Sequence, residues 1–181
     1  GTETNPITFQ KSGGGANPKL NILGTAATND MGVWFYGDYT TFDGIDINDA
    51  GTTSADYLET GVYLQGPTAD NCKFVTVKNS TIDLNKANTS SKGVYLYSNA
   101  PTSVENTNRN NKFYNNTVQD AYSAYYFSGS STYLSDGNEI GIDGGTSLID
   151  NIGNNLSTAV YAIYAPYETN FKLFNTTVSN V

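Results

Sequence analysis

Asn79-Ser80-Thr81-Ile82 is the stretch of sequence that decides the fold, because copies of it recur along the chain. The copies are Asn115-Asn116-Thr117-Val118 and Asn175-Thr176-Thr177-Val178, and Asp43-Gly44-Ile45 is a shortened one. One interval is 36 residues, from 79 to 115. The next, from 115 to 175, is 60 residues and corresponds to two steps of 30 with a degenerate copy between them. Self-similarity at a near-constant period indicates a structural repeat protein.

A second phrase runs in phase with the first and has the alternation of a strand. In Gly61-Val62-Tyr63-Leu64-Gln65, Val62 and Leu64 fall on one face and Tyr63 and Gln65 on the other. If its copies keep that parity, equivalent residues stack like on like, as they do in parallel strands in register. The copies are Gly32-Val33-Trp34-Phe35-Tyr36, Gly93-Val94-Tyr95-Leu96-Tyr97, Ser123-Ala124-Tyr125-Tyr126-Phe127 and Tyr161-Ala162-Ile163-Tyr164-Ala165.

The composition indicates an all-β protein. Only 14% of the residues are charged, while 14 Tyr and 8 Phe supply most of the bulk, and turn-forming residues separate the β-branched and aromatic runs. Because the polar segments between the phrases lack helical periodicity, the crossovers between parallel strands must themselves consist of strands and turns. We therefore predict a right-handed parallel β-helix of about five to six coils, forming a single domain over residues 1–181.

The asparagine of the first phrase has a structural explanation. A sharp bend between two strands often requires a left-handed backbone, which Asn tolerates, and its amide can bond neighbouring backbone. Stacked coils would also align the Asn amides in a ladder. Asn-X-Thr spells an N-glycosylation acceptor as well, but the constant phase and the following Ile or Val favour the turn interpretation. By the same alignment, Asp43 occupies the turn position in the shortened copy.

Charge and hydropathy exclude two classes of partner. The net charge is −8, with 9 Lys plus Arg against 17 Asp plus Glu, so nothing would neutralise a run of phosphates and nucleic-acid binding is disfavoured. No apolar run approaches the length needed to span a bilayer, so membrane insertion is not expected. Low charge, an acidic balance and heavy use of Asn, Thr, Ser and Gly favour an extracellular or bacterial cell-surface location.

Several further phrases carry a resemblance to a known family. The sequence resembles the large secreted, right-handed parallel β-helix repeat proteins exported by type IX secretion in gliding Gram-negative bacteria, which include surface adhesins. The resemblance implies the pectate-lyase-like superfold but no shared catalytic motif. Beside the Asn-X-Thr-Ile repeats, it rests on Pro6-Ile7-Thr8-Phe9-Gln10-Lys11-Ser12-Gly13, Asp38-Tyr39-Thr40-Thr41-Phe42-Asp43-Gly44-Ile45-Asp46-Ile47 and Gly137-Asn138-Glu139-Ile140-Gly141.

Enzymes with this superfold provide an alternative interpretation, a polysaccharide lyase or a glycoside hydrolase fragment. A polygalacturonase-like site combines clustered Asp residues with His, and this chain has no His. A lyase-like site needs a basic group beside acidic calcium ligands. Asp43, Asp46 and the chain's one arginine, Arg109, are the candidates for such a site. No convergent catalytic set is evident, and the sequence favours a non-catalytic module.

The densest acidic cluster is the candidate metal site. Asp43, Asp46 and Asp49, with Asp56 nearby, are the candidate calcium ligands, and the alternative is that they are ordinary turn and surface acids. No other cofactor is expected.

The strongest candidate for a binding surface is the outer face of the second phrase. With Val and Leu inward, the outward residues would lie about 4.8 Å apart from coil to coil and form a flat aromatic strip. Such a strip suits a polysaccharide or a surface glycan, whereas the purely structural alternative is that the aromatic ladder stabilises the sheet. The predicted strip consists of Trp34, Tyr36, Tyr63, Tyr95, Tyr97, Tyr125 and Phe127.

Three functions remain open from the sequence. The first is a structural and adhesive module that contacts glycans through its aromatic face, and the second is the enzyme fragment. The third is a self-assembling extracellular filament subunit, because neither end carries the polar capping unit that solenoids need. We expect the chain to be a segment of a longer protein, or its ends to be covered by neighbouring copies.

Overall fold

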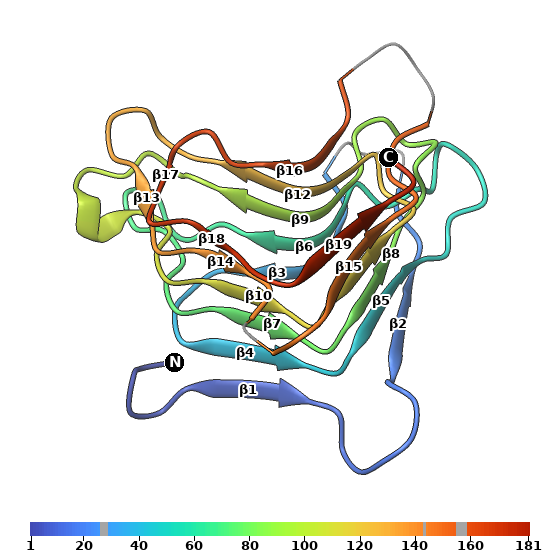
Figure 1. The fold of residues 1–181 in the computed structure, drawn as a ribbon, viewed down its shortest axis with the longest axis horizontal. Helices are drawn as coiled ribbons and strands as arrows, with labels where there is room; N and C mark the ends of the chain where they lie inside the picture. Colours follow the sequence, from blue (N-terminus) through green and yellow to red (C-terminus); the bar gives the residue numbers. More distant parts are fainter. Residues whose placement is uncertain (26–28, 143, 155–158) are drawn as a thin grey trace.

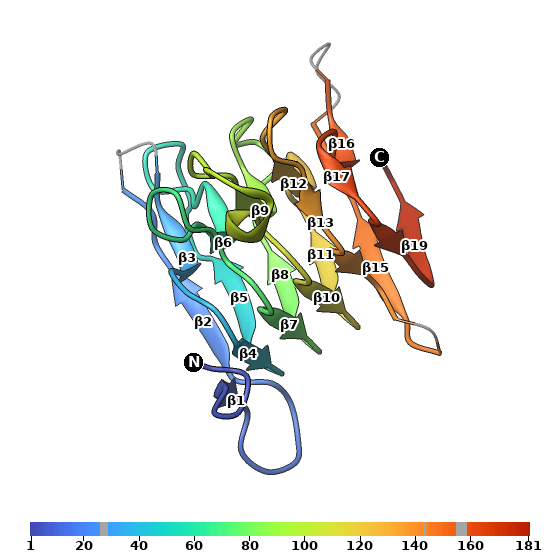
Figure 2. The same ribbon diagram turned by 90° about the vertical axis from the view of Figure 1, so that its left-hand side faces the viewer.

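The computed structural model describes residues 1–25, 29–142, 144–154 and 159–181 and is a parallel β-solenoid (Figure 1). Five coils each contribute one strand to three parallel sheets, and part of a sixth coil follows. Figure 2 shows the coils stacked in chain order from the N-terminal to the C-terminal end. The prediction of an all-β parallel β-helix with five to six coils is confirmed. In the part of the chain that is described, no helix has the length and hydropathy to cross a membrane.

Each sheet collects the equivalent strand of successive coils. Sheet 1 is β1 (Ile7–Gln10), β4 (Thr40–Asp43), β7 (Thr76–Lys78), β10 (Lys112–Tyr114), β14 (Glu139–Ile140) and β18 (Lys172–Leu173). Sheet 2 is β2 (Lys19–Ile22), β5 (Asp46–Asp49), β8 (Thr81–Asp83), β11 (Thr117–Gln119), β15 (Ser147–Asp150) and β19 (Thr176–Ser179).

Sheet 3 completes each of the five coils, and a short fourth sheet joins two successive coils. Sheet 3 is β3 (Met31–Phe35), β6 (Thr60–Leu64), β9 (Lys92–Tyr97), β12 (Ser123–Ser128) and β16 (Tyr161–Tyr164). The fourth sheet is β13 (Ser135–Asp136) with β17 (Glu168–Thr169), and a single 3₁₀ turn, Val104–Asn106, precedes β10.

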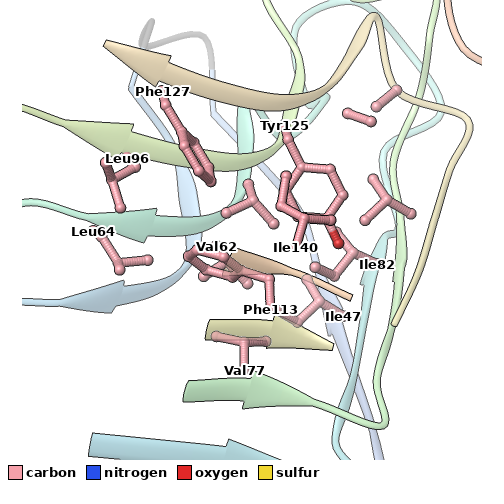
Figure 3. Close-up of a cluster of buried hydrophobic side chains, with 14 of the residues drawn as sticks. Ile47, Val62, Leu64, Val77, Ile82, Leu96, Phe113, Tyr125, Phe127 and Ile140 are labelled. Carbon is pink, nitrogen blue, oxygen red and sulfur yellow. The ribbon is translucent and has the colours of Figure 1, made fainter. Parts of the chain in front are cut away.

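The core consists of columns of inward side chains that run through successive coils. In sheet 2, in-register pairing places Ile47, Ile82, Val118 and Ile149 in one column, and all four are fully buried. In sheet 1 the corresponding column passes through Phe42, Val77, Phe113 and Ile140. Figure 3 shows members of both columns meeting the inward residues of sheet 3 at the centre of the coil.

The corner between sheets 1 and 2 confirms the turn interpretation of the asparagine phrase. Asn79, Asn115 and Asn175 have positive φ angles of 56°, 54° and 35°, the left-handed conformation that Asn tolerates. Part of the predicted ladder is present, because the Asn115 amide donates to the Asn79 side-chain oxygen at 3.3 Å and the Asn79 amide donates to Asp43 at 2.7 Å. The Asn175 amide donates instead to the carbonyl of Ile142 at 3.1 Å.

The turn residue in the shortened copy is Gly44, and the prediction of Asp43 there is wrong. Asp43 pairs with Lys78, so Gly44 lies opposite Asn79 and has the left-handed φ angle, 66°. Glycine adopts this conformation without steric cost. Asp43 ends β4 instead and faces Lys78, with 3.1 Å between the charged groups.

Glycines in sheet 3 couple the two repeated phrases. A Cβ atom at Gly32 would lie 2.8 Å from Cγ2 of Ile47, and a Cβ atom at Gly61 would meet Ile82 in the same way. At Gly93 a Cβ atom would meet Cγ1 of Val118 and would lie 2.9 Å from the carbonyl oxygen of Ala124. Each glycine therefore leaves room for an inward Ile or Val of sheet 2 in the next coil.

We predict that Gly93→Ala lowers the free energy of unfolding by about 1–3 kcal/mol, because the added methyl overpacks the core against Val118. Gly37→Ala is the matched control, since no atom lies within 4 Å of the added methyl, and it should stay within about 0.5 kcal/mol of the parent. Urea unfolding measures both. The double variant Gly93→Ala with Val118→Ala should lose less free energy of unfolding than the sum of the losses in the two single variants. Losses that simply add would contradict the proposed contact.

Candidate functional site

The outer face of sheet 3 carries a continuous row of aromatic rings. The row, here called the aromatic strip, consists of one residue per coil: Trp34, Tyr63, Tyr95, Tyr126 and Tyr164. Ring centroids of successive members are 6.0, 5.2, 5.6 and 4.5 Å apart, and the last pair is stacked. A second row flanks it, in which Tyr36 and Tyr97 meet strip residues edge to face.

Two predicted members of the binding face, Tyr125 and Phe127, point into the core and are fully buried (Figure 3). The sequence alignment placed Ser123 opposite Gly93, whereas the structure pairs Ser123 with Lys92 and Tyr125 with Val94. A slip of one residue exchanges the two faces of a strand. The outward residue of β12 is therefore Tyr126, which pairs with Tyr95.

The same slip affects β16. Ile163 pairs with the buried Tyr125, and Tyr164 pairs with Tyr126 on the outer face. Ala124 lies opposite Gly93, so alanine takes the place of glycine in this coil. A small residue opposite the glycines was not a sufficient signal for the register, because Ser123 is also small and stands next to Ala124.

Exposure varies along the strip. Trp34 and Tyr36 are open to solvent, with 52% and 58% of their surfaces exposed, whereas Tyr63 is only 7% exposed because rings on both sides cover it. Burial raises the pKa of Tyr63 to about 12, so its hydroxyl stays protonated at neutral pH. The indole Nε1 of Trp34 donates to the carbonyl of Gln65 at 3.1 Å, which fixes the outermost ring.

Two shallow hollows lie beside the middle of the strip, at the N-terminal end of β9. Hollow 1 has a volume of about 170 Å³ and is lined by Glu59, Tyr63, Lys92 and Tyr95, among others. Hollow 2 has a volume of about 180 Å³, and its lining includes Lys92, Ser123, Tyr126 and Tyr161. Lys92 therefore separates the hollows and contributes to both. Nothing in the sequence indicated a role for this lysine, because Lys92 precedes the repeated phrase and is neither aromatic nor acidic.

The predicted calcium ligands have separate partners. Asp43 accepts from Asn79 and pairs with Lys78, Asp46 accepts from Asn17 and from the backbone of Thr81, and Asp49 accepts from the backbone of Gly51 and Leu58. Desolvation acts to raise the pKa of Asp43, but hydrogen bonds from Asn79 and Lys78 outweigh it and hold that pKa below its usual value. Among the described residues, no group of three or more His, Cys, Asp and Glu is arranged to hold a metal ion.

The residues of the predicted lyase-like site are not brought together. Arg109 pairs with Asp136, with 3.3 Å between the charged groups, and lies opposite Lys73 at the start of the sheet 1 strands. Asp43 lies opposite Lys78, at the other end of those strands. The arginine and the acidic residues are therefore at different corners of the coil.

A buried carboxylate that the sequence did not indicate lies in β17. Glu168 pairs with Ser135, and its Oε2 accepts from the Asn138 amide at 2.8 Å. Burial raises the pKa of Glu168 to about 7, helped by the negative charge of Asp136 and opposed by the hydrogen bond from Asn138.

Glu168 should make stability depend on pH. The pKa in the folded state, about 7, lies above the ordinary 4.5, so the folded protein holds this proton more tightly than the unfolded chain does. That contribution is fully present below pH 4.5 and is lost as the pH rises through 7. It is on the order of 3 kcal/mol, at about 1.4 kcal/mol per pKa unit. Thermal unfolding between pH 5 and pH 8 measures it.

Glu168→Gln should remove most of this pH dependence, because an amide does not titrate. Glu3→Gln, at an exposed position near the N-terminus, is the control and should keep the dependence of the parent. Equal slopes for the parent protein and Glu168→Gln would show that the carboxylate is not held as described.

Comparisons with known proteins add little. No protein-family model matches the chain, and no curated protein matches it. A solved structure titled "Crystal structure of Agl-KA catalytic domain" resembles it with a TM-score of 0.30 and 14% sequence identity, over 97% of this chain and 36% of that one. The chain thus spans about a third of the length of that structure, and the similarity is too distant to indicate a function.

Proposed function

We propose that this chain is a non-catalytic, glycan-binding module of a secreted or cell-surface protein, and that the aromatic strip is its contact surface. The observation that carries the proposal is the continuity of the strip, with one ring per coil and successive centroids 4.5–6.0 Å apart. The apolar face of a sugar ring packs against such rings, and the tyrosine hydroxyls and indole nitrogen are suited to its hydroxyls.

The distribution of exposure supports a binding role for part of the strip. Trp34 and Tyr36 are more than half exposed, although large aromatic side chains gain most when buried. Tyr126, Tyr161 and Tyr164 form a second cluster of partly exposed rings beside hollow 2. Tyr63 lies between the two clusters and is nearly covered, so it supports its neighbours more than it offers contact surface.

The proposal predicts that Trp34→Ala combined with Tyr126→Ala weakens glycan binding at least tenfold, about 1.4 kcal/mol, because both exposed clusters lose their central ring. A glycan array followed by calorimetry on the best ligand would measure the change. Tyr114→Ala is the matched control, because this tyrosine lies in β10 of sheet 1, beside Lys78. A loss of affinity in the control equal to that in the strip variant would contradict the assignment.

We propose end-to-end association as a second function, because two core columns end uncovered. Phe9 and Leu20, in the first coil, are 54% and 39% exposed, while Leu173 and Val178, in the last, are 52% and 47% exposed. Each pairs with a buried neighbour of its own column and so faces inward. A second copy would continue sheets 1 and 2, whereas sheet 3, with one strand fewer, would be interrupted.

Sedimentation velocity should then show growth of the assembly with protein concentration. Leu20→Lys blocks one end and Val178→Lys blocks the other, so each variant alone should remain monomeric. A mixture of the two should stop at dimers, because each copy retains one open end of the opposite kind. A parent protein that remains monomeric at every concentration, or a mixture that does not dimerise, would contradict this proposal.

A further inference from the structure

Lys92 is a cation placed within the aromatic strip. It begins β9, and its ammonium lies 5.1 Å from the ring centroid of Tyr95 and 5.4 Å from that of Tyr126. Nζ also donates to the carbonyl of Ser90 at 3.0 Å. A cation over aromatic faces is attracted to them, and the attraction increases as water is removed. The side chain is therefore held at a fixed place between hollow 1 and hollow 2.

The ammonium of Lys92 has no anionic partner within 4 Å among the described residues. In this acidic protein, Lys73, Lys78 and Lys172 each have a carboxylate within that distance. Burial lowers the pKa of Lys92, and the negative charge of Glu59 acts against that change. A half-buried charge without an anionic partner is costly, so the surroundings of Lys92 favour the binding of an anion.

Glu59 is not the anionic partner of Lys92. Its carboxylate accepts from the backbone N–H of Asp30 at 3.0 Å and from the Asn88 amide at 3.2 Å. Glu59 lines hollow 1 but not hollow 2. Among the described residues, the lining of hollow 2 contains no carboxylate, and it presents hydroxyl-bearing residues, among them Ser123, Tyr126 and Tyr161, beside the ammonium.

We infer that Lys92 binds an anionic substituent, a carboxylate or a sulfate, of a glycan whose rings lie along the aromatic strip, and that hollow 2 receives this substituent. The inference rests on the proposed glycan-binding function and specifies the class of ligand. The volume of hollow 2, about 180 Å³, suits one small charged group and is too small for a chain of sugar rings. The sugar rings would lie along the exposed edges of Tyr126 and Tyr164, because the faces of these two tyrosines stack on each other beside hollow 2.

Matched polymers test this inference without knowledge of the natural ligand. Dextran, carboxymethyl dextran and dextran sulfate share one backbone, and hydroxyethyl and carboxymethyl cellulose provide a second. Affinity electrophoresis measures binding to each. The parent protein should bind a charged polymer about tenfold more tightly than its neutral counterpart, and the two dextran derivatives should show whether carboxylate or sulfate is preferred.

Lys92→Gln should lower binding to the charged polymers to the level of their neutral counterparts and so abolish this preference. Lys19→Gln is the charge control, because it removes the same charge from β2 on sheet 2 and should keep the preference. Equal binding of charged and neutral polymers by the parent, or an equal effect of the two lysine changes, would overturn the inference while leaving the glycan-binding proposal intact. That proposal fails separately if Trp34→Ala with Tyr126→Ala leaves binding to every polymer unchanged.

Discussion

Hydrogen bonding between parallel strands in register is the constraint on which the rest of this structure depends. Because each residue lies directly beside its equivalent in the next coil, any side chain is packed against another of the same position. An inward column must therefore be apolar throughout, as the column from Ile47 to Ile149 is. The glycines of sheet 3 follow from the same constraint, since each must leave room for the column of sheet 2.

The repeated phrases were sufficient to predict the fold and its corners. The left-handed turn asparagines and their ladder follow from local chemistry that a short phrase contains. Register within one strand was harder, because Ser123-Ala124-Tyr125-Tyr126-Phe127 has three consecutive aromatic residues and hence no clear alternation. Ser123 and Ala124 are both small enough to lie opposite Gly93, so the glycine column does not decide the register, and the strand pairing shows that Ala124 takes that place. Asp43 was misplaced for a similar reason, since Gly44 satisfies the turn better than any Asp.

The candidate site was only partly predictable. The residue types and the sheet that bears them were evident from the period, and Trp34, Tyr63 and Tyr95 do form one outward row. Exposure was not evident, because the extent to which the rings of Trp34 and Tyr95 cover Tyr63 depends on their tilt and not on their order in the sequence. Lys92 and Glu168 were missed because their properties depend on their surroundings in the fold. Two tyrosine rings lie beside Lys92, and burial removes Glu168 from water.

Stacking alone does not explain the form of the strip. A ladder that served only to stabilise sheet 3 would gain most from rings as covered as Tyr63, and the exposure of Trp34 and Tyr36 is expected beside β3, which is an edge strand of that sheet. A ladder of that kind would also gain little from a lysine without a carboxylate partner at its centre, since that charge is partly removed from water. The lysine is explained if a ligand with apolar ring faces and an anionic group completes the surface. The aromatic strip then has two physical roles, and Tyr63 belongs to the first while Trp34, Lys92 and Tyr126 belong to the second.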